Sequence, residues 1–567
     1  MENDGNENVT HPLDGPIHSQ NIANVKIQNG NFTLQSSAER ESQKNEDGIY
    51  NEVDNIFFEN VAEYTNDPLK LIEKLKEKYK NEFKDWKCLH TNQTEHGDLV
   101  RMRGMILNGM QTVFALNAVI TEEEDGTTRT VCGILRNRIN CSNIKETKSM
   151  TRRNAYILVP ERGVTDWYLE TFNGKNNQTS CEAFPKNDEP RTYALFYDEE
   201  SENFKPNVVF DLYGILDLTE MTTEDDDDPD TKSSLSMMSL HVIHYEPVEY
   251  HDIVSLAHPE VLKYKNMHGF ESLIFAFEQL FGNKVIAQSL ACHLFISRHS
   301  QPPGSMEYTF PYTIKRVFDS KSIIEMIKLF MPKVHVIEMM EKTMEKSWAS
   351  YERPQSGFEQ GLLQVSDNTL IIIDETKSST ENILLTKKGR ENCHLMKKFL
   401  STRKIPFIYP YQTVEIESNA NVIVLSGEKC FFGQEEFAMV MPKSYLKDVD
   451  FVRQFATTHE NELHICRHAL LSCFKSLCDV SICKTVEEMA VESFLSMQRI
   501  CRNADDNSAR LHRQLILSKL LTSLNGEKIV GKDYWARAVE LENGIFSEIV
   551  KQFLIMRYFI EVLEFLT

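Results

Sequence analysis

One short segment in the middle of the chain has the composition of a catalytic strand. Leu370 to Ile373 are consecutive apolar residues, and Asp374 and Glu375 follow them directly. Such a run predicts a buried strand that delivers two carboxylates at its carboxyl end. In nucleotide hydrolases this is the Walker B segment, in which the aspartate holds magnesium and the glutamate orients the attacking water. A buried strand that ends in a polar turn gives the same letters, so both interpretations stay open.

A nucleotide site also needs a phosphate-binding loop, and no standard loop precedes Asp374. The pattern G-x-x-x-x-G-K-[ST] offers backbone N–H groups and a lysine to the phosphates. A later partial match, Gly526–Asp533, has Asp533 where the hydroxyl residue belongs and follows a helical pattern, so we interpret it as a connection between helices. Ser426, after the apolar strand Asn421–Leu425, could sense a γ-phosphate, although a core strand entering a turn is the simpler interpretation. The glycines between residues 267 and 365, none of which opens the pattern, are Gly269, Gly282, Gly304, Gly357 and Gly361.

Other reactive residue types lack the spacing of a known centre. Zinc ligands usually come as C-x₂₋₄-C pairs, and here the cysteines are five to seven positions apart within a helical pattern. We therefore interpret them as small buried side chains. Neither G-x-S-x-G nor H-E-x-x-H occurs, so the common hydrolase signatures are absent. We expect no catalytic residue, no metal and no cofactor. The cluster consists of Cys466, Cys473, Cys478 and Cys483 with His464 and His468.

Composition and charge restrict the class of protein that must position these residues. The chain has 567 residues, 41% of them hydrophobic, and 62 Lys+Arg against 84 Asp+Glu give a net charge of −22. A protein that mainly grips nucleic acid needs basic faces, so protein partners are favoured over sequence-specific binding of nucleic acid. We expect no secretory signal at Met1–Asp4 and no membrane span, because no apolar run approaches 18 residues. Twelve cysteines without paired spacing predict reduced thiols in an intracellular protein.

The first half of the chain changes from polar to strand-rich. Residues 1–50 are acidic and lack periodicity, which predicts a disordered tail, and residues 51–95 carry a helix that begins near Asp67-Pro68. Residues 96–250 show short alternating and β-branched runs, typical of a small closed barrel such as an OB-fold, with an acidic loop at 221–236. The expected strands are Leu99–Leu107, Thr112–Ile120, Arg129–Leu135, Ala155–Val159, Thr192–Tyr197, Val208–Leu218 and Leu240–Tyr245.

The second half alternates helices with short apolar strands and then becomes helical. Residues 251–445 predict an α/β domain whose parallel sheet is buried on both faces. The expected strands there are Leu370–Ile373, Ile405–Ile408 and Asn421–Leu425, and the expected helices are 267–281, 284–299, 317–330 and 333–347. Residues 446–567 predict a C-terminal helical domain. Its last stretch, Phe553–Ile560, is apolar nearly all round and must be buried, either by the domain itself or by a partner.

Several of these segments together resemble the mini-chromosome maintenance (MCM) complex-binding protein family. Gln360–Val365 followed by Asn368–Thr376 is similar to the most recognisable segment of that family, and Tyr534–Ala538 also fits. In the strand-rich half, Val209–Leu216 and Leu240–Ile243 carry the likeness, which covers about residues 55–567. One departure is the stretch Asn173–Pro190, where the family has a basic cluster and this chain has only two lysines.

The resemblance implies a nuclear protein that binds subunits of the replicative MCM helicase. Such proteins act in assembly of the helicase, in its unloading from chromatin and in sister-chromatid cohesion. It also implies an α+β multidomain fold: an OB-like β-barrel, then a degenerate AAA+-like α/β domain and a lid-like helical end. In that fold Asp374 and Glu375 are vestigial Walker B carboxylates without a phosphate cradle.

Three functions remain in competition. The first is a non-catalytic pseudo-subunit that associates with MCM subunits, which is an analogy from fold to function. The second is an active AAA+-type ATPase with an atypical phosphate loop, which requires ATP to bind near Asp374. The third is a single-strand nucleic-acid binder that stacks bases on barrel aromatics, for which Phe114, Tyr156, Trp167 and Phe196 are available.

Overall fold

The computed structural model of the chain describes residues 48–566 apart from short internal gaps. Residues 49–567 form one of the two compact units of the chain. The predicted tail at 1–50 and the acidic loop at 221–236 lie almost entirely outside the described residues. The gaps are residues 90–92, 110–112, 124–125, 138, 140–142, 174–190, 222–234, 249–250, 297–311, 354–356, 378–385, 428–429, 433–437, 443–445 and 501–503.

Three helices open the described part of the chain: α2 (Gly48–Glu59), α3 (Val61–Asn66) and α4 (Pro68–Tyr79). α4 begins at Pro68, where the sequence predicts a helix start. The expectation that the segment before residue 60 lacks periodicity is wrong for α2. Its residues Ile49, Val53, Ile56 and Phe57 recur at helical spacing and are buried in one cluster with side chains of α4 and of the following sheet.

An eight-stranded sheet follows, in the order β1-β2-β7-β8-β6-β5-β3-β4. All seven expected strands are present, and the first half of β5, where most residues are exposed, is an addition that the apolar pattern does not signal. α5 (Asp166–Asn173) lies between β5 and β6 in the chain. The strands are β1 (Lys87–Cys88), β2 (Leu99–Gly109), β3 (Val113–Glu122), β4 (Thr128–Cys132), β5 (Ile144–Val159), β6 (Thr192–Phe196), β7 (Val209–Met221) and β8 (Leu235–Pro247).

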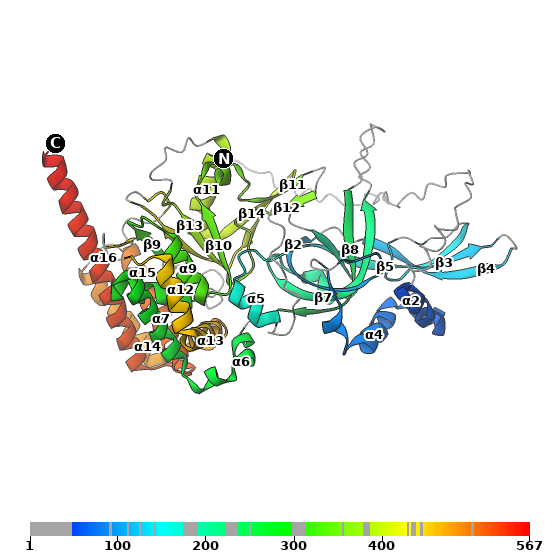
Figure 1. Cartoon of the computed structure of the whole chain (residues 1–567), viewed down its shortest axis with the longest axis horizontal. Coiled ribbons are helices and arrows are strands. Elements are labelled where there is room, and N and C mark those ends of the chain that lie inside the picture. The colour runs from blue at the N-terminus through cyan, green and yellow to red at the C-terminus, as the bar shows by residue number, and fades with distance from the viewer. Residues whose placement is uncertain are drawn as a thin grey trace, which may run out of the picture. The chain divides into compact units, whose positions relative to one another are not determined.

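Five of these strands close into a ring because β2 pairs with β5 as well as with β7. The ring runs β2-β7-β8-β6-β5 and returns to β2, and only its β6–β8 pairing is parallel. β3 and β4 continue beyond the ring along the first half of β5 (Figure 1). Side chains that alternate along the strands fill one buried cluster, which includes Val100, Met102, Leu158, Phe196 and Leu212.

A second sheet has five strands in the order β10-β13-β16-β9-β17, and every pairing in it is parallel. A smaller sheet has the order β12-β11-β14-β15. The strands of the parallel sheet are β9 (Tyr312–Lys315), β10 (Val334–Glu338), β13 (Leu370–Asp374), β16 (Asn421–Leu425) and β17 (Ala438–Val440). Those of the smaller sheet are β11 (Ser350–Arg353), β12 (Gly357–Glu359), β14 (Lys404–Ile408) and β15 (Thr413–Glu417).

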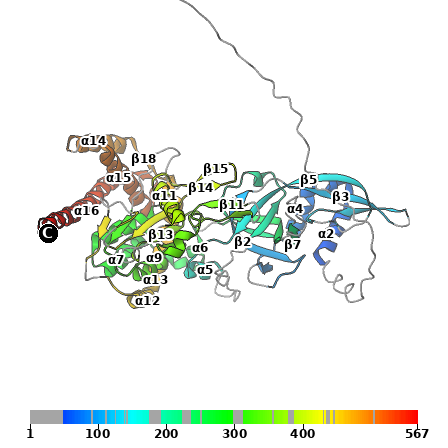
Figure 2. The ribbon, with the colours of Figure 1, turned by 90° about the horizontal axis from the view of Figure 1, so that it is seen from above.

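Helices cover both faces of the parallel sheet, as its continuous apolar strands predict. Leu370 and Ile372 point into a core with α7, α8, α9 and α13, whereas Ile371 and Ile373 face a second core with α11. α9 and α11 accordingly lie on opposite sides of β13 (Figures 1 and 2). The helices of this region are α6 (Ile253–Ala257), α7 (Asn266–Phe281), α8 (Lys284–Phe295), α9 (Lys321–Phe330), α10 (Glu341–Glu345) and α11 (Lys387–Thr402).

The predicted helix over 333–347 is wrong. Residues 334–338 form β10, which pairs with β13, and only the five-residue helix α10 follows. Val334, Val336, Ile337, Met339 and Met340 satisfy the spacing of a helix as well as that of a buried strand. The parallel neighbour β13 decides between the two by offering its free backbone groups.

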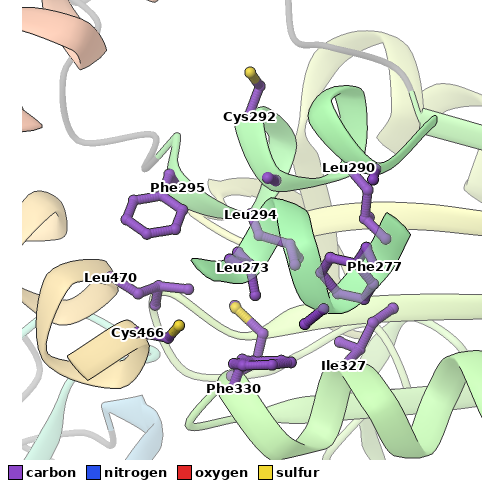
Figure 3. Close-up of a cluster of buried hydrophobic side chains, with 14 of the residues drawn as sticks. Leu273, Phe277, Leu290, Cys292, Leu294, Phe295, Ile327, Phe330, Cys466 and Leu470 are labelled. Carbon is purple, nitrogen blue, oxygen red and sulfur yellow. The ribbon is translucent and has the colours of Figure 1, made fainter. Parts of the chain in front are cut away.

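The C-terminal region is helical, with α12 (Val449–Thr458), α13 (Glu460–Ser476), α14 (Lys484–Ile500), α15 (Ala504–Leu524) and α16 (Lys532–Leu566). Leu470 of α13, Phe277 of α7 and Phe330 of α9 meet in the large buried cluster drawn in Figure 3. Within the described residues, no helix is both long and apolar enough to cross a membrane. The side chains of Phe553–Ile560 lie outside the description, so the partner of that apolar stretch stays a prediction.

Candidate functional site

The carboxyl edge of the parallel sheet brings the predicted site residues together. Asp374, the last residue of β13, lies in register beside Leu425 of β16, and Leu425 lies beside Ile314 of β9. Glu375 and Ser426 follow directly after their strands, and the loop from β9 to α9 begins at the same edge. This is where open α/β sheets bind their ligands, because the helices that follow the strands begin there.

Asp374 is buried, and groups of the protein itself occupy its carboxylate. The hydroxyl of Ser320 donates to Asp374 Oδ2 at 2.5 Å. The backbone N–H of Thr376 donates to Oδ1 at 3.0 Å, and the Thr376 hydroxyl donates to the same atom at 2.6 Å. Since an ionised carboxylate offers about four acceptor sites, three of them are in use. A magnesium ion or its water would have to displace these donors.

Glu375 is also held inward by the backbone. The N–H groups of Phe431 and Phe432 donate to Glu375 Oε2 and Oε1 at 2.8 and 2.7 Å, and the side chain is fully buried. Burial raises the pKa of Glu375, and the two backbone N–H groups oppose this shift without cancelling it. A catalytic glutamate must reach a water molecule beside the phosphate. This one instead fixes the segment after β16.

The loop between β9 and α9 occupies the place of a phosphate cradle, and sequence reasoning missed it. Lys315 to Ser322 fits the eight-residue phosphate-loop pattern at its final Lys321-Ser322, but Lys315 and Ser320 stand where the glycines belong. The search required glycines and therefore passed over the segment. A Lys-Ser pair directly after a strand and before an amphipathic helix is the signal that could have found it.

Hydrogen bonds in this loop leave less of its backbone for a phosphate. The N–H groups of Arg316 and Val317 donate to the carbonyls of Gly427 and Ser426, and the N–H of Lys321 donates to Asp319 Oδ1. Arg316 has a φ of 60°, which favours glycine and is strained in a residue with a side chain. A phosphate cradle needs several N–H groups free and convergent. Here three of them already have partners.

The predicted cysteine cluster does not form a centre. Cys466 and Cys473 lie on α13 in the large core, and the Cys466 thiol donates to the Gly269 carbonyl. Burial raises the pKa of the Cys473 thiol to about 12, so that thiol stays protonated. His464 instead stacks on His258 with ring centroids 3.7 Å apart. The part of the chain that the structure describes contains no group of three or more His, Cys, Asp or Glu that could hold a metal.

The aromatic residues proposed as a base-stacking platform do not share a surface. Tyr156 and Phe196 pack edge to face inside the barrel. Trp167 is buried against α9, where its indole N–H donates to the carbonyls of Lys328 and Met331. Phe114 is exposed. A single exposed ring offers no continuous stacking path, so these residues do not support the nucleic-acid hypothesis.

The late partial phosphate-loop match is a connection between helices, as predicted. α15 ends at Leu524, and Gly526 turns the chain with a φ of 79°. The two-residue strand β19 (Ile529–Val530) pairs with β18 (Ser481–Ile482) before α16 begins at Lys532. Asp533 therefore lies in the first turn of a helix, at some remove in sequence and in fold from the carboxyl edge of the parallel sheet.

Comparison with known proteins places the chain among replication proteins. A family described as mini-chromosome maintenance replisome factor matches residues 183–547. The match includes the ring strands β6, β7 and β8, the whole parallel sheet and most of the C-terminal helices.

Individual relatives are similar at low identity. Mini-chromosome maintenance complex-binding protein of Gallus gallus is 22% identical over 281 residues, 48% of this chain and 43% of the relative. The protein of that name from Salmo salar is 22% identical over 395 residues, 61% of this chain and 60% of the relative. The Arabidopsis thaliana protein is 23% identical over 182 residues, 32% and 29% of the two lengths. The chain thus spans about half the length of the curated relatives it matches.

Proposed function

Because the chain belongs to the mini-chromosome maintenance replisome factor family, we propose that it is a non-catalytic protein that binds subunits of the MCM helicase. The printed name of its relatives describes them as binding that complex. The observation that carries the non-catalytic part is the state of Asp374 and Glu375, whose carboxylate oxygens accept hydrogen bonds from five protein donors.

The strand orders support the finer assignment of the two domains. Numbered along the chain, the parallel sheet reads 5-1-4-3-2 from β17 to β10, the order of AAA+ ATPase cores. The closed ring reads 1-2-3-5-4 from β2, with its third and fifth strands parallel, which is the arrangement of OB-folds. An OB-like barrel followed by an AAA+-like domain has the architecture of a helicase subunit, and we infer a pseudo-subunit on that analogy.

The chemistry of the carboxyl edge supports binding without hydrolysis. Magnesium needs oxygen ligands in near-octahedral geometry and usually keeps several of its waters. Asp374 and Glu375 would have to exchange short protein hydrogen bonds for that shell. The loop from Lys315 to Ser322 lacks the glycines that let a backbone approach phosphate closely.

We propose further that the protein acts in the nucleus, in the assembly or chromatin unloading of the helicase during DNA replication and in sister-chromatid cohesion. Its net charge of −22 supports a partner that carries basic, DNA-binding surfaces. The same charge opposes direct binding to DNA.

The test is direct association with purified helicase subunits of the same organism. The tagged full-length chain is mixed with each MCM subunit at moderate salt and separated by size-exclusion chromatography. We expect stoichiometric co-elution with at least one subunit, and none with an unrelated acidic protein of similar net charge used in place of the chain. Failure of every subunit to co-elute, singly or as the assembled complex, would contradict the proposal.

A further inference from the structure

A solvent-open groove of about 630 Å³ lies between helices of the C-terminal half, away from the carboxyl edge of the parallel sheet. α7 forms one wall, the start of α8 and Leu521 of α15 contribute to the lining, and α16 forms the other wall. The packing of α16 on α8 and α15 brings these walls together.

The floor of this groove is apolar. Phe270 and Leu521 are buried below it, and Ile274 and Leu541 line it half-buried. Phe275 stands on its edge with 49% of its surface exposed. Met267, Phe270, Ile274 and Glu278 follow one another at steps of three or four along α7, so one helical stripe forms the wall. From Met267 to Glu278 this stripe is about 17 Å long, at 1.5 Å per residue.

The rim is acidic and has charge to offer. Glu271 and Glu278 on α7 and Glu540 on α16 line the groove together with Lys284 and Arg537. Among the described residues, none of these three carboxylates takes part in an ion pair. Carboxylates on both walls of an apolar groove favour a ligand with an apolar face and positive charges on its flanks.

We propose that this groove binds an amphipathic helix of a protein partner, with large apolar residues on one face and lysine or arginine beside them. A helix of three turns matches the length of the α7 stripe, and two or three apolar side chains match the volume. A small polar ligand fits less well, because no buried polar side chain lines the floor.

Gly544 offers a variant that fills the groove without disturbing the fold. It lines the groove from α16, and a Cβ atom added to it meets no atom within 4 Å. Glycine inside a helix costs about 1 kcal/mol relative to alanine, so larger residues there are compatible with the helix. Gly544→Trp therefore blocks the groove, and Gly544→Ala is its matched control.

The experiment measures fluorescence anisotropy of a labelled peptide titrated with the full-length chain. The peptide is a lysine- and leucine-based amphipathic helix of about 18 residues, and a scrambled peptide of identical composition lacks the continuous apolar face. We expect the amphipathic peptide to bind about ten times more tightly than the scrambled one. Gly544→Trp should weaken it about ten-fold and Gly544→Ala less than about two-fold. The double variant Glu271→Lys/Glu278→Lys should weaken it and flatten its salt dependence.

Two results would overturn the proposal, and both require that circular dichroism shows each variant folded. One is equal binding of the two peptides, which would mean charge attraction alone. The other is unchanged binding to Gly544→Trp. Self-association of the chain that Gly544→Trp abolishes, without any peptide binding, would assign the groove to a second copy and equally reject a partner helix. Since no helicase subunit is used, the outcome is independent of the proposed function.

Discussion

At the residue scale, Asp374 and Glu375 are in the position of catalytic carboxylates but are bonded as structural ones. Ser320 reaches Asp374 from the very loop that would hold phosphates, so the two halves of a nucleotide site are tied to each other. Glu375 in turn fixes the backbone at Phe431 and Phe432. In such a site the carboxylates contribute to folding, and their removal is felt as a loss of stability.

This difference predicts the behaviour of Asp374→Asn. The amide offers one acceptor oxygen in place of two and directs an N–H group toward existing donors. We expect the free energy of unfolding in urea to fall by about 1–3 kcal/mol, the cost of an unsatisfied buried group. Isothermal titration with Mg-ATP should give no binding heat for either protein. Micromolar binding of Mg-ATP to the natural chain, lost in Asp374→Asn, would instead support an active ATPase.

At the element scale, the sequence predicts what periodicity alone can decide. β13 and β16 are continuous apolar runs between polar turns, and both are strands. β10 was assigned to a helix because its short run fits two periods, and only its pairing with β13 resolves the choice. The Lys321-Ser322 loop was missed since its lost glycines were the search criterion. The hydrogen bonds that fill the site join Ser320 to Asp374, 54 residues apart, and no local pattern encodes them.

α2 shows the same limit in another form, because polar neighbours mask its apolar stripe. Phe57 is fully buried in the cluster that joins α2 and α4 to the sheet, whereas the adjacent Phe58 is 45% exposed. We expect Phe57→Ala to lower the free energy of unfolding by about 3–5 kcal/mol, the usual cost of a large core truncation. Phe58→Ala should cost less than about 1 kcal/mol. Equal effects of the two variants in urea denaturation would mean that α2 does not pack as described.

At the scale of the whole molecule, a buried ion pair joins the strand-rich half to the α/β half. Lys333, just before β10, donates to Glu161 Oε1 at 3.2 Å, to the Ser366 hydroxyl and to the Asp367 carbonyl. Burial would raise the pKa of Glu161, but the Lys333 ammonium outweighs it and holds that pKa below its usual range. Gln364 adds a hydrogen bond to the Leu107 carbonyl of β2. A pseudo-subunit that presents both halves to one partner benefits from such a fixed junction.

A double-mutant cycle tests whether this junction couples the two halves. Lys333→Met alone leaves a buried carboxylate uncompensated, and Glu161→Leu alone leaves a buried ammonium, so each should cost about 3–5 kcal/mol of unfolding free energy. The double variant replaces both charges with apolar groups and should recover most of that loss. Urea denaturation is followed by far-UV circular dichroism and by tryptophan fluorescence. The coupling is contradicted if the double variant loses the sum of the single effects, because the two charges would then act independently of each other.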